Sequence, residues 1–371
     1  MAVSGKVYGK GDFTVGIKNK NATAFETPAA NDAAYELLPV TNVSLPVLNL
    51  IESGEIRSNN AGMIELDIDQ FRTQKGGFVT MDFELPAERE IIVRLLANVL
   101  QDHGESGSSP YIHTIQATSS AALARPDFTG SSSSGIPSIF DVALYMPETA
   151  QDIMITSAVL QSLTLNFDMA DGRCLLSGTI YSGMSSSSKF LVEQTLSANS
   201  GAATLTSTAP TFVEAYFNTK TLDIEATDNQ DIMVQAVSFT FENNVARVGR
   251  DSNGDAEAYS FGIPSVNITG EISFLMNDDM GFDAADNVLQ DFLSGETATL
   301  TLQQGDGTVS SAGEMNITAE IYSTAVNLDP SSETGAVFTV PFKVVQPTSS
   351  GAASGTAFKF EYADSTQASD W

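Results

Sequence analysis

The alternation of large apolar and polar side chains in many short segments restricts the fold of this chain more than any other feature of its sequence. Successive side chains of a β-strand point to opposite faces, so a period of two indicates strands with one buried face. Asp171-Gly172 and Asp306-Gly307 lie between alternating segments, and Asp-Gly favours tight hairpin turns. We therefore expect a mainly β fold. The alternating segments are residues 78–85, 163–167, 237–241, 266–274, 298–302, 315–321 and 338–342.

Two segments have the spacing of an α-helix instead. Residues 88–100 follow Pro86, begin with acidic side chains and place apolar ones every three or four positions, as an amphipathic helix does. Residues 283–293 repeat that spacing and are followed by Gly295, a residue type that commonly ends helices. We expect one short helix in each half of the chain.

The order of these elements recurs along the chain. Val43 and Val237 each open a strand that leads into a polar loop, an alternating strand and one of the two helices. The separation of these valines equals that of Leu95 and Leu289, and a recurrence of order and spacing indicates a duplicated domain. A shorter repeat relates 152–154 to 231–233, but no helix accompanies it, so we give it less weight.

Stretches rich in Ser, Ala, Thr and Gly mark the expected boundaries. We expect a first domain over 1–185, a linker over 186–210 whose middle (190–196) could be ordered, and a second domain over 211–371. The first domain includes an N-terminal arm and a Ser/Gly-rich stretch at 101–138. That stretch is longer than ordinary connections in compact domains, which indicates an insertion or a binding loop.

The chain is strongly acidic. Its 46 Asp and Glu outnumber 17 Lys and Arg, giving a formal net charge of −29 over 371 residues, which excludes binding of nucleic acid by phosphate neutralisation. No run of about 18 apolar residues occurs, so we expect no membrane-spanning helix. A single cysteine excludes an intrachain disulfide. The first residues lack the apolar core of an export signal, so we expect a protein made and used in a cytoplasm or released by lysis.

The residue types that usually carry catalysis are scarce. His103 and His113 are the only histidines, and we interpret them as ordinary loop residues, since a triad or a histidine metal site needs more partners. We interpret Cys174 as a small core residue. Residues 251–257 resemble the start of a calcium loop, but Ala256 and Gly262 stand where glycine and glutamate are needed. No catalytic, cofactor-binding or metal-binding residue is therefore expected, nor any cofactor, and we expect a protein that is not an enzyme.

Several segments, in this order, resemble the tail tube (major tail) proteins of long-tailed bacteriophages. Residues 52–58 are the segment most like that family, and the likeness covers most of the chain. The segments that carry it are 11–17, 27–28, 37–45, 52–58, 76–77, 95–100, 237–239, 243–244, 249 and 266–272.

The resemblance implies two tandem β-sandwich or barrel-like domains, each with one short helix, whose sheets join those of neighbouring subunits. It implies a structural virion protein that assembles with itself into stacked rings, here three chains per ring with pseudo-six-fold symmetry, located in the virion tail and assembled in the host cytoplasm. Its other partners would be the tape measure, tail tip and terminator proteins. DNA would pass through an acidic lumen during ejection without specific binding, and no membrane would be involved.

The resemblance also implies polar loops that contact the adjacent ring. By position, residues 52–60 and 247–255 are the candidates, with Arg57, Arg247 and Arg250 pairing with carboxylates. The alternative interpretation is that these are solvated loop charges, since exposed ion pairs contribute little. The stretch 101–138 would decorate the outer surface. The assembly candidates are Glu52, Glu55, Arg57, Ser58, Asn59, Arg247, Arg250 and Asp251.

Three other classes of protein stay open at this point. A secreted adhesin or pilus-like β-sandwich would explain the Ser/Thr-rich strands. The second class is a different β-rich virion protein, such as a decoration or fibre protein. The duplication and residues 52–58 favour the tube over it, and fibres usually show shorter regular repeats. A glycosidase on a β-scaffold would need a pair of carboxylates in different environments, which a sequence does not reveal.

Overall fold

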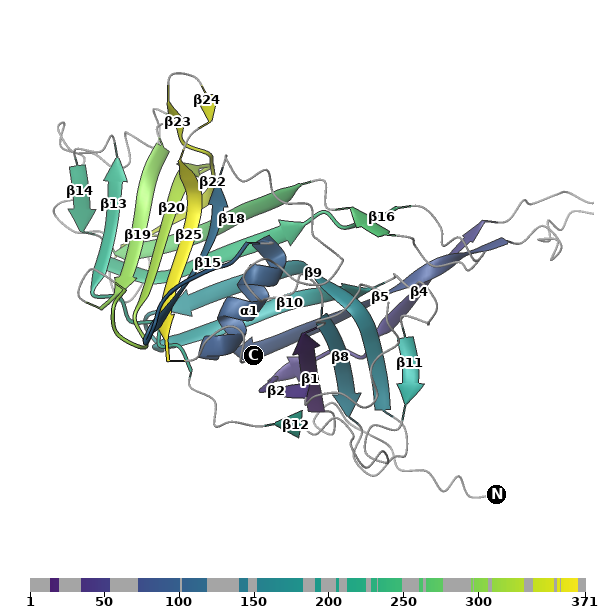
Figure 1. The fold of residues 1–371 in the computed structure, drawn as a ribbon. Helices are drawn as coiled ribbons and strands as arrows, with labels where there is room; N and C mark the ends of the chain where they lie inside the picture. Colours follow the sequence, from purple (N-terminus) through teal and green to yellow (C-terminus); the bar gives the residue numbers. More distant parts are fainter. Residues whose placement is uncertain are drawn as a thin grey trace, which may run out of the picture.

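The fold, seen in a computed structural model, is mainly β with one α-helix among the described residues (Figure 1). No helix in this part of the chain has the length and apolar character to span a membrane. The structure describes residues 14–19, 35–53, 73–100, 102–118, 140–145, 152–182, 191–194, 205–206, 212–224, 228–231, 233–248, 260–262, 265–275, 295, 297–305, 309–329, 336–349, 352–353 and 355–365.

One antiparallel sheet, the first sheet, runs through both halves of the chain. At its centre, β9 from the first half pairs with β15 from the second half, from Asp168↔Ala236 to Ser162↔Glu242. In spatial order its strands are β3 (Asn42–Val43) and β4 (Val47–Ser53), β5 (Thr73–Pro86), β10 (Arg173–Ser182), β9 (Asp152–Asp168), β15 (Met233–Asn243), β18 (Val266–Leu275), β22 (Val337–Val344) and β21 (Asn327–Asp329).

A second antiparallel sheet lies across the first. It also mixes the two halves, because the C-terminal strand β25 pairs with β7. Its spatial order is β14 (Asp228–Asp231), β13 (Thr219–Ile224), β19 (Thr297–Gln304), β20 (Met315–Ser323), β25 (Thr356–Asp364), β7 (Tyr111–Thr118) and β6 (Gly104–Gly107). A short β20–β22 ladder connects it to the first sheet.

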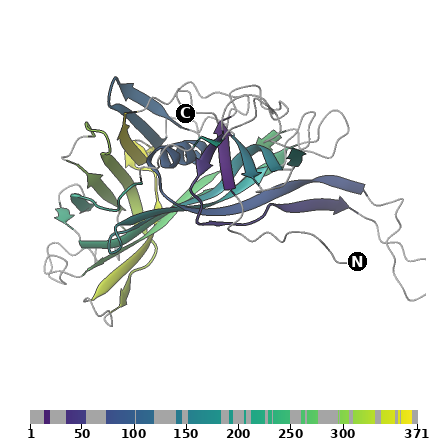
Figure 2. The ribbon, with the colours of Figure 1, turned by 90° about the horizontal axis from the view of Figure 1, so that it is seen from below.

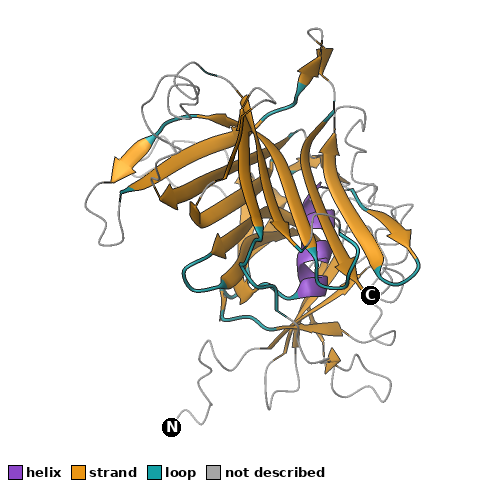
Figure 3. Ribbon diagram, turned by 90° about the vertical axis from the view of Figure 1, so that its left-hand side faces the viewer, coloured by secondary structure: helices purple, strands orange, loops and turns teal. Residues whose placement is uncertain are grey.

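Aromatic side chains pack the two sheets together. Phe239 and Phe241 of β15 meet Phe358 of β25 edge to face, with ring centroids 5.5 and 5.1 Å apart. Such contacts add to the burial of large apolar surfaces. Strict alternation in β20, where Met315, Ile317, Ala319 and Ile321 are buried, confirms the half-buried strands expected from the sequence. The two sheets therefore pack through aromatic side chains, and the helix lies among the strands (Figure 3).

The helix α1 (Arg89–Leu100) confirms the helix expected at 88–100. It packs on β9, β7 and β15, and every residue from Ile91 to Leu100 is buried. The polar side chains Arg94 and Asn98 are buried with the apolar ones, and burial lowers the pKa of Arg94 to about 10. The helix is therefore enclosed on all sides rather than amphipathic at a surface.

A third sheet grows from the first half of β9. This part of β9 pairs with β8 and β11 instead of β15. The further strands of the third sheet are β8 (Phe140–Tyr145), β1 (Thr14–Asn19), β2 (Tyr35–Leu38), β12 (Leu205–Thr206) and β11 (Leu191–Gln194). Two small hairpins complete the described strands: β16 (Ala246–Val248) with β17 (Ser260–Gly262), and β23 (Thr348–Ser349) with β24 (Ala352–Ala353).

The sequence-based organisation agrees with this fold in part. The β-rich class is confirmed, but the connected strands do not close into a barrel. Two tandem domains stay a prediction, because strands of both halves share the first and second sheets. Part of the expected insertion, 104–107 and 111–118, is a hairpin of the second sheet rather than a loop. Residues 191–194 of the expected linker form β11. The helix expected at 283–293 lies outside the described residues.

Candidate assembly surfaces

The β3–β4 side of the first sheet forms an apolar rim. On their outer side, neither strand pairs with another strand of the described residues. Leu45, Val47 and Leu48 are 53, 53 and 47% exposed. Because neighbouring side chains of a strand point to opposite faces, both faces of the rim are open here. A rim strand with exposed apolar side chains is a template for pairing with another chain.

Beyond this rim, β4 and β5 continue as a two-stranded ribbon. The partner strand β10 reaches only Val79 of β5, whereas β4 pairs with β5 as far as Ser53↔Thr73. The ribbon of residues 49–53 and 73–78 therefore projects from the body of the molecule (Figures 1 and 2). Isolated two-stranded ribbons are marginally stable in water, so the ribbon is suited to packing against another surface.

Two of the residues chosen as assembly candidates, Glu52 and Arg247, lie on elements at one end of the first sheet. Glu52 is in the ribbon, opposite Gln74, and Arg247 is in β16, opposite Phe261. Paired residues form one row across four strands of the first sheet: Asp82 of β5, Thr179 of β10, Ser162 of β9 and Glu242 of β15. The ribbon end of β5 and the end of β15 that leads to β16 lie on the same side of this row, so both elements leave the sheet at the same end. The other candidates, Glu55, Arg57, Ser58, Asn59, Arg250 and Asp251, and the calcium-like stretch 251–257, lie outside the described residues.

The outer face of the first sheet, which points away from the second sheet, is polar and acidic. Hydroxyl and carboxylate groups bond sideways across its strands: Thr164 with Thr240 at 3.1 Å, and Thr179 with Asp82 at 2.7 Å. The described charged side chains on this face are the acids Asp82, Glu84, Asp168, Glu242 and Glu271 and the bases Arg173 and Lys343.

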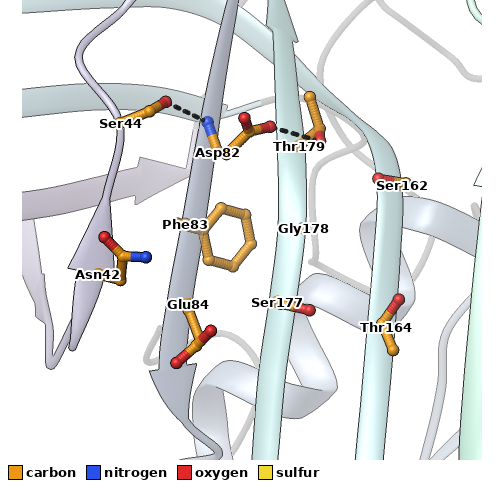
Figure 4. A pocket seen from close by; sticks show the side chains of 10 residues that line it. All are labelled: Asn42, Ser44, Asp82, Phe83, Glu84, Ser162, Thr164, Ser177, Gly178 and Thr179. Atoms are coloured by element: carbon orange, nitrogen blue, oxygen red, sulfur yellow. Dashed lines mark hydrogen bonds between the residues drawn. The ribbon is translucent and has the colours of Figure 1, made fainter.

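A groove of about 450 Å³ indents this face near the rim (Figure 4). Phe83 and Gly178, whose side-chain positions face the core, line it between the outer-face residues of β5, β10 and β9. The peptide N–H of Asp82 donates to the Ser44 hydroxyl at 2.8 Å. Its walls are Asn42, Ser44, Asp82, Glu84, Ser162, Thr164, Ser177 and Thr179. Such a lining suits a polar, positively charged group.

The groups that sequence analysis considered for catalysis lie in two different places. Cys174 is buried in β10, as expected, and burial raises the pKa of its thiol well above the ordinary value. The interpretation as a loop residue is wrong for His113, which is in β7, whereas His103 does lie in the connection between α1 and β6. The two histidines contact each other in a buried site. Nowhere in the described ranges do three His, Cys, Asp or Glu side chains gather as a metal site would require.

The rim, the groove and the histidine contact could not be found in the sequence. Leu45, Val47 and Leu48 look like core residues of a strand, and only the pairing of β4 with a single neighbour exposes them. The histidines are ten residues apart on a polar stretch.

Comparison with known proteins gives no relative: no protein-family model matches the chain, and no curated protein matches it significantly.

Proposed function

We propose that the chain is a structural virion protein that assembles with copies of itself into stacked rings, forming the hollow tube of a bacteriophage tail. The observation that carries this proposal is the apolar rim at Leu45, Val47 and Leu48, on a rim strand beside a projecting ribbon. Because the formal net charge is −29, copies repel each other over most of their surface. The apolar rim at the border of the first sheet is where that repulsion is overcome.

The ring contact is edge-to-edge strand pairing. The β9–β15 ladder supports this mode of joining, since it already connects strands of the two halves within one chain. In the proposed ring, the β3–β4 rim of one copy extends the first sheet of the next copy in the same way. Three chains would then give six similar sectors, provided that the two halves are duplicates.

Stacking of rings uses the end of the first sheet from which the ribbon and β16 emerge. The ribbon leads into residues 54–72, which contain Arg57, and β16 leads into Arg250 and Asp251. These charged groups would pair with carboxylates of the adjacent ring. A head-to-tail contact of this kind does not close on itself, so it extends into a tube.

The outer face of the first sheet is the proposed lining of the lumen. Among the described residues, its five carboxylates against two bases would keep DNA phosphates away from the wall, because like charges repel over about 10 Å at 0.1 M salt. DNA would then pass without binding. Tape measure, tail tip and terminator proteins are the other proposed partners.

The test is assembly of the purified chain, followed by light scattering and negative-stain microscopy at rising concentration. The native chain is expected to form rings or tubes. Leu45→Glu/Leu48→Glu is expected to remain monomeric, because both side chains are exposed in the monomer and the change adds charge to the rim. Met233→Glu/Tyr216→Glu, at two exposed apolar residues away from the rim, is the matched control and should assemble. A native chain that stays monodisperse, or a rim variant that assembles like the control, would contradict the proposal.

A further inference from the structure

The only two histidines of the chain touch each other in a buried site. His103 Nε2 lies 3.1 Å from His113 Nδ1, and the rings are stacked with centroids 5.4 Å apart and planes inclined by 27°. His103 is 8% exposed and His113 is fully buried. At 3.1 Å, the two nitrogens share a hydrogen bond, which needs an N–H on one and a lone pair on the other.

The pair connects the end of α1 to the β6–β7 hairpin. The helix ends at Leu100, and His103 follows shortly after it. His113 lies in β7 and has a pairing partner on each side, Glu105 of β6 and Tyr362 of β25. Since β6 is the last described strand on its side of the second sheet, the hairpin is held by the β7–β25 ladder, by α1 and by this contact.

Several titratable groups face the pair from the elements around it. From β6, Glu105 Oε2 lies 4.0 Å from His113 Nδ1. Next to His103, Asp102 accepts a hydrogen bond of 2.9 Å from the Gln116 N–H, and burial is the main cause that raises its pKa. Burial also raises the pKa of Tyr362, so this phenol stays neutral. The remaining charged residues of the packed elements are Arg89, Glu90 and Arg94 on α1, and Lys359, Glu361 and Asp364 on β25.

Protonation acts on this contact in two steps. A first proton taken from solvent can bind a nitrogen away from the contact, which leaves the hydrogen bond in place as a charge-assisted one. A second proton puts N–H groups on both contacting nitrogens and places two positive charges on stacked, buried rings. This arrangement cannot keep the hydrogen bond, and burial of two positive charges is costly.

We propose that His103 and His113 form an acid-sensitive latch that holds the β6–β7 hairpin against the end of α1 and releases it when both imidazoles are protonated. Release would loosen one border of the second sheet while the β9–β15 centre of the first sheet stays intact. The latch does not depend on the assembly proposal, because it is defined within one chain.

Hydrogen exchange of the full chain between pH 7.5 and 5.5 tests the latch. After correction for the intrinsic exchange rate, protection of peptides from 102–118 is expected to fall about tenfold per pH unit for each proton taken up on opening. The fall should begin at the pH where the exposed imidazoles of the opened hairpin take up protons. Peptides from β9 and β15 should keep their protection, since no histidine lies in them. Constant protection of 102–118 over this range would overturn the proposal.

A matched variant distinguishes the effect of protonating the histidines from the effect of protonating the nearby acids. In His103→Gln/His113→Asn, amide groups lie close to the positions of Nε2 and Nδ1 and keep a hydrogen bond without titrating. Its hairpin protection is expected to be independent of pH. An equal loss of hairpin protection at acid pH in this variant would assign the effect to Asp102 or Glu105 and overturn the latch.

Imidazole NMR of the native chain gives a second test should the variant not fold. The chain has two histidines, so two imidazole spin systems are expected, titrating in two coupled steps. Only the second step should coincide with loss of hairpin protection. Full protonation of both rings with the hairpin still protected would also overturn the proposal.

Discussion

Two buried asparagine side chains fix the point at which β9 leaves the third sheet and enters the first. The Leu160 N–H donates to Asn98 Oδ1 at 3.1 Å, and the Leu160 carbonyl accepts from Asn243 Nδ2 at 2.9 Å. The neighbouring residue Gln161 has no partner in the β9–β10 register, where pairing jumps from Ser162 to Leu160. A bulge of this kind bends a strand and interrupts its ladder, and the two amides replace the ladder bonds at the bend.

We expect Asn243→Ala to destabilise the fold by about 1–3 kcal/mol, because it leaves the buried Leu160 carbonyl without its donor. Urea unfolding at neutral pH measures the change. Asn244→Ala is the control, since its side chain is exposed and bonds to Ser265, and it should cost less than about 0.5 kcal/mol. Equal losses for the two variants would mean that the amide does not hold the bend.

Two glycines in the first sheet are needed for the close approach of a phenylalanine. Gly178 pairs with Phe83 and Gly270 with Phe342, and in both places a Cβ would collide with the ring and with a strand carbonyl. We expect Gly178→Ala and Gly270→Ala each to cost about 1–3 kcal/mol through overpacking. Thermal or urea unfolding would measure this loss. Gly104→Ala in β6, where the nearest atom is 3.8 Å from the added Cβ, should have a small effect, and a similar loss there would point to a general effect of glycine replacement.

At the scale of elements, the sequence predicts the faces of strands but not their partners. Alternation in 237–241 and 315–321 correctly gives the buried sides of β15 and β20, because the sorting of side chains onto two faces of a strand depends on local order alone. The β9–β15 and β7–β25 ladders join distant segments, so their existence depends on the whole fold.

The β6–β7 hairpin shows why part of the fold was missed. β6 contains two glycines and two polar residues, and none of them is buried, so it has neither alternation nor β-propensity. Its pairing with β7 and the β7–β25 ladder fix it instead. The histidine contact was missed for the same reason, since it exists only when β7 lies beside the end of α1.

The register around the centre of the first sheet has a local two-fold relation. A two-fold rotation about the Thr164–Thr240 pair exchanges Leu163 with Phe239. Gly178 on β10 pairs with Leu163 and Gly270 on β18 pairs with Phe239, so the same rotation exchanges the two glycines. In this relation β9 corresponds to β15 with Thr164 matching Thr240, a spacing that neither the shorter repeat of 152–154 and 231–233 nor the longer one has. The duplication expected from the longer repeat stays a prediction.

At the scale of the whole molecule, the proposed tube depends on which face of the first sheet points inward. The outer face of the first sheet carries more acid than base, and its hydroxyl groups are bonded to neighbouring strands. The outer face of the second sheet mixes signs more closely, as in the contact of 2.6 Å between Lys359 and Glu361. The excess of acidic over basic side chains on the described part of this face favours the first sheet as the wall that DNA passes, since its phosphates would find little to bind.

Reversing charge on that wall is the test at this scale. Glu84→Lys/Glu242→Lys/Glu271→Lys changes three side chains of the outer face of the first sheet, all of which point away from the core. In assembled particles it is expected to slow DNA ejection, and the delay should shrink as salt is raised, because phosphate contacts are screened. The control, Glu320→Lys/Glu361→Lys, places new positive charge on the second sheet and should leave ejection unchanged. A delay in the control but not in the first variant would place the second sheet at the lumen, and no delay in either would remove wall charge from the mechanism of DNA passage.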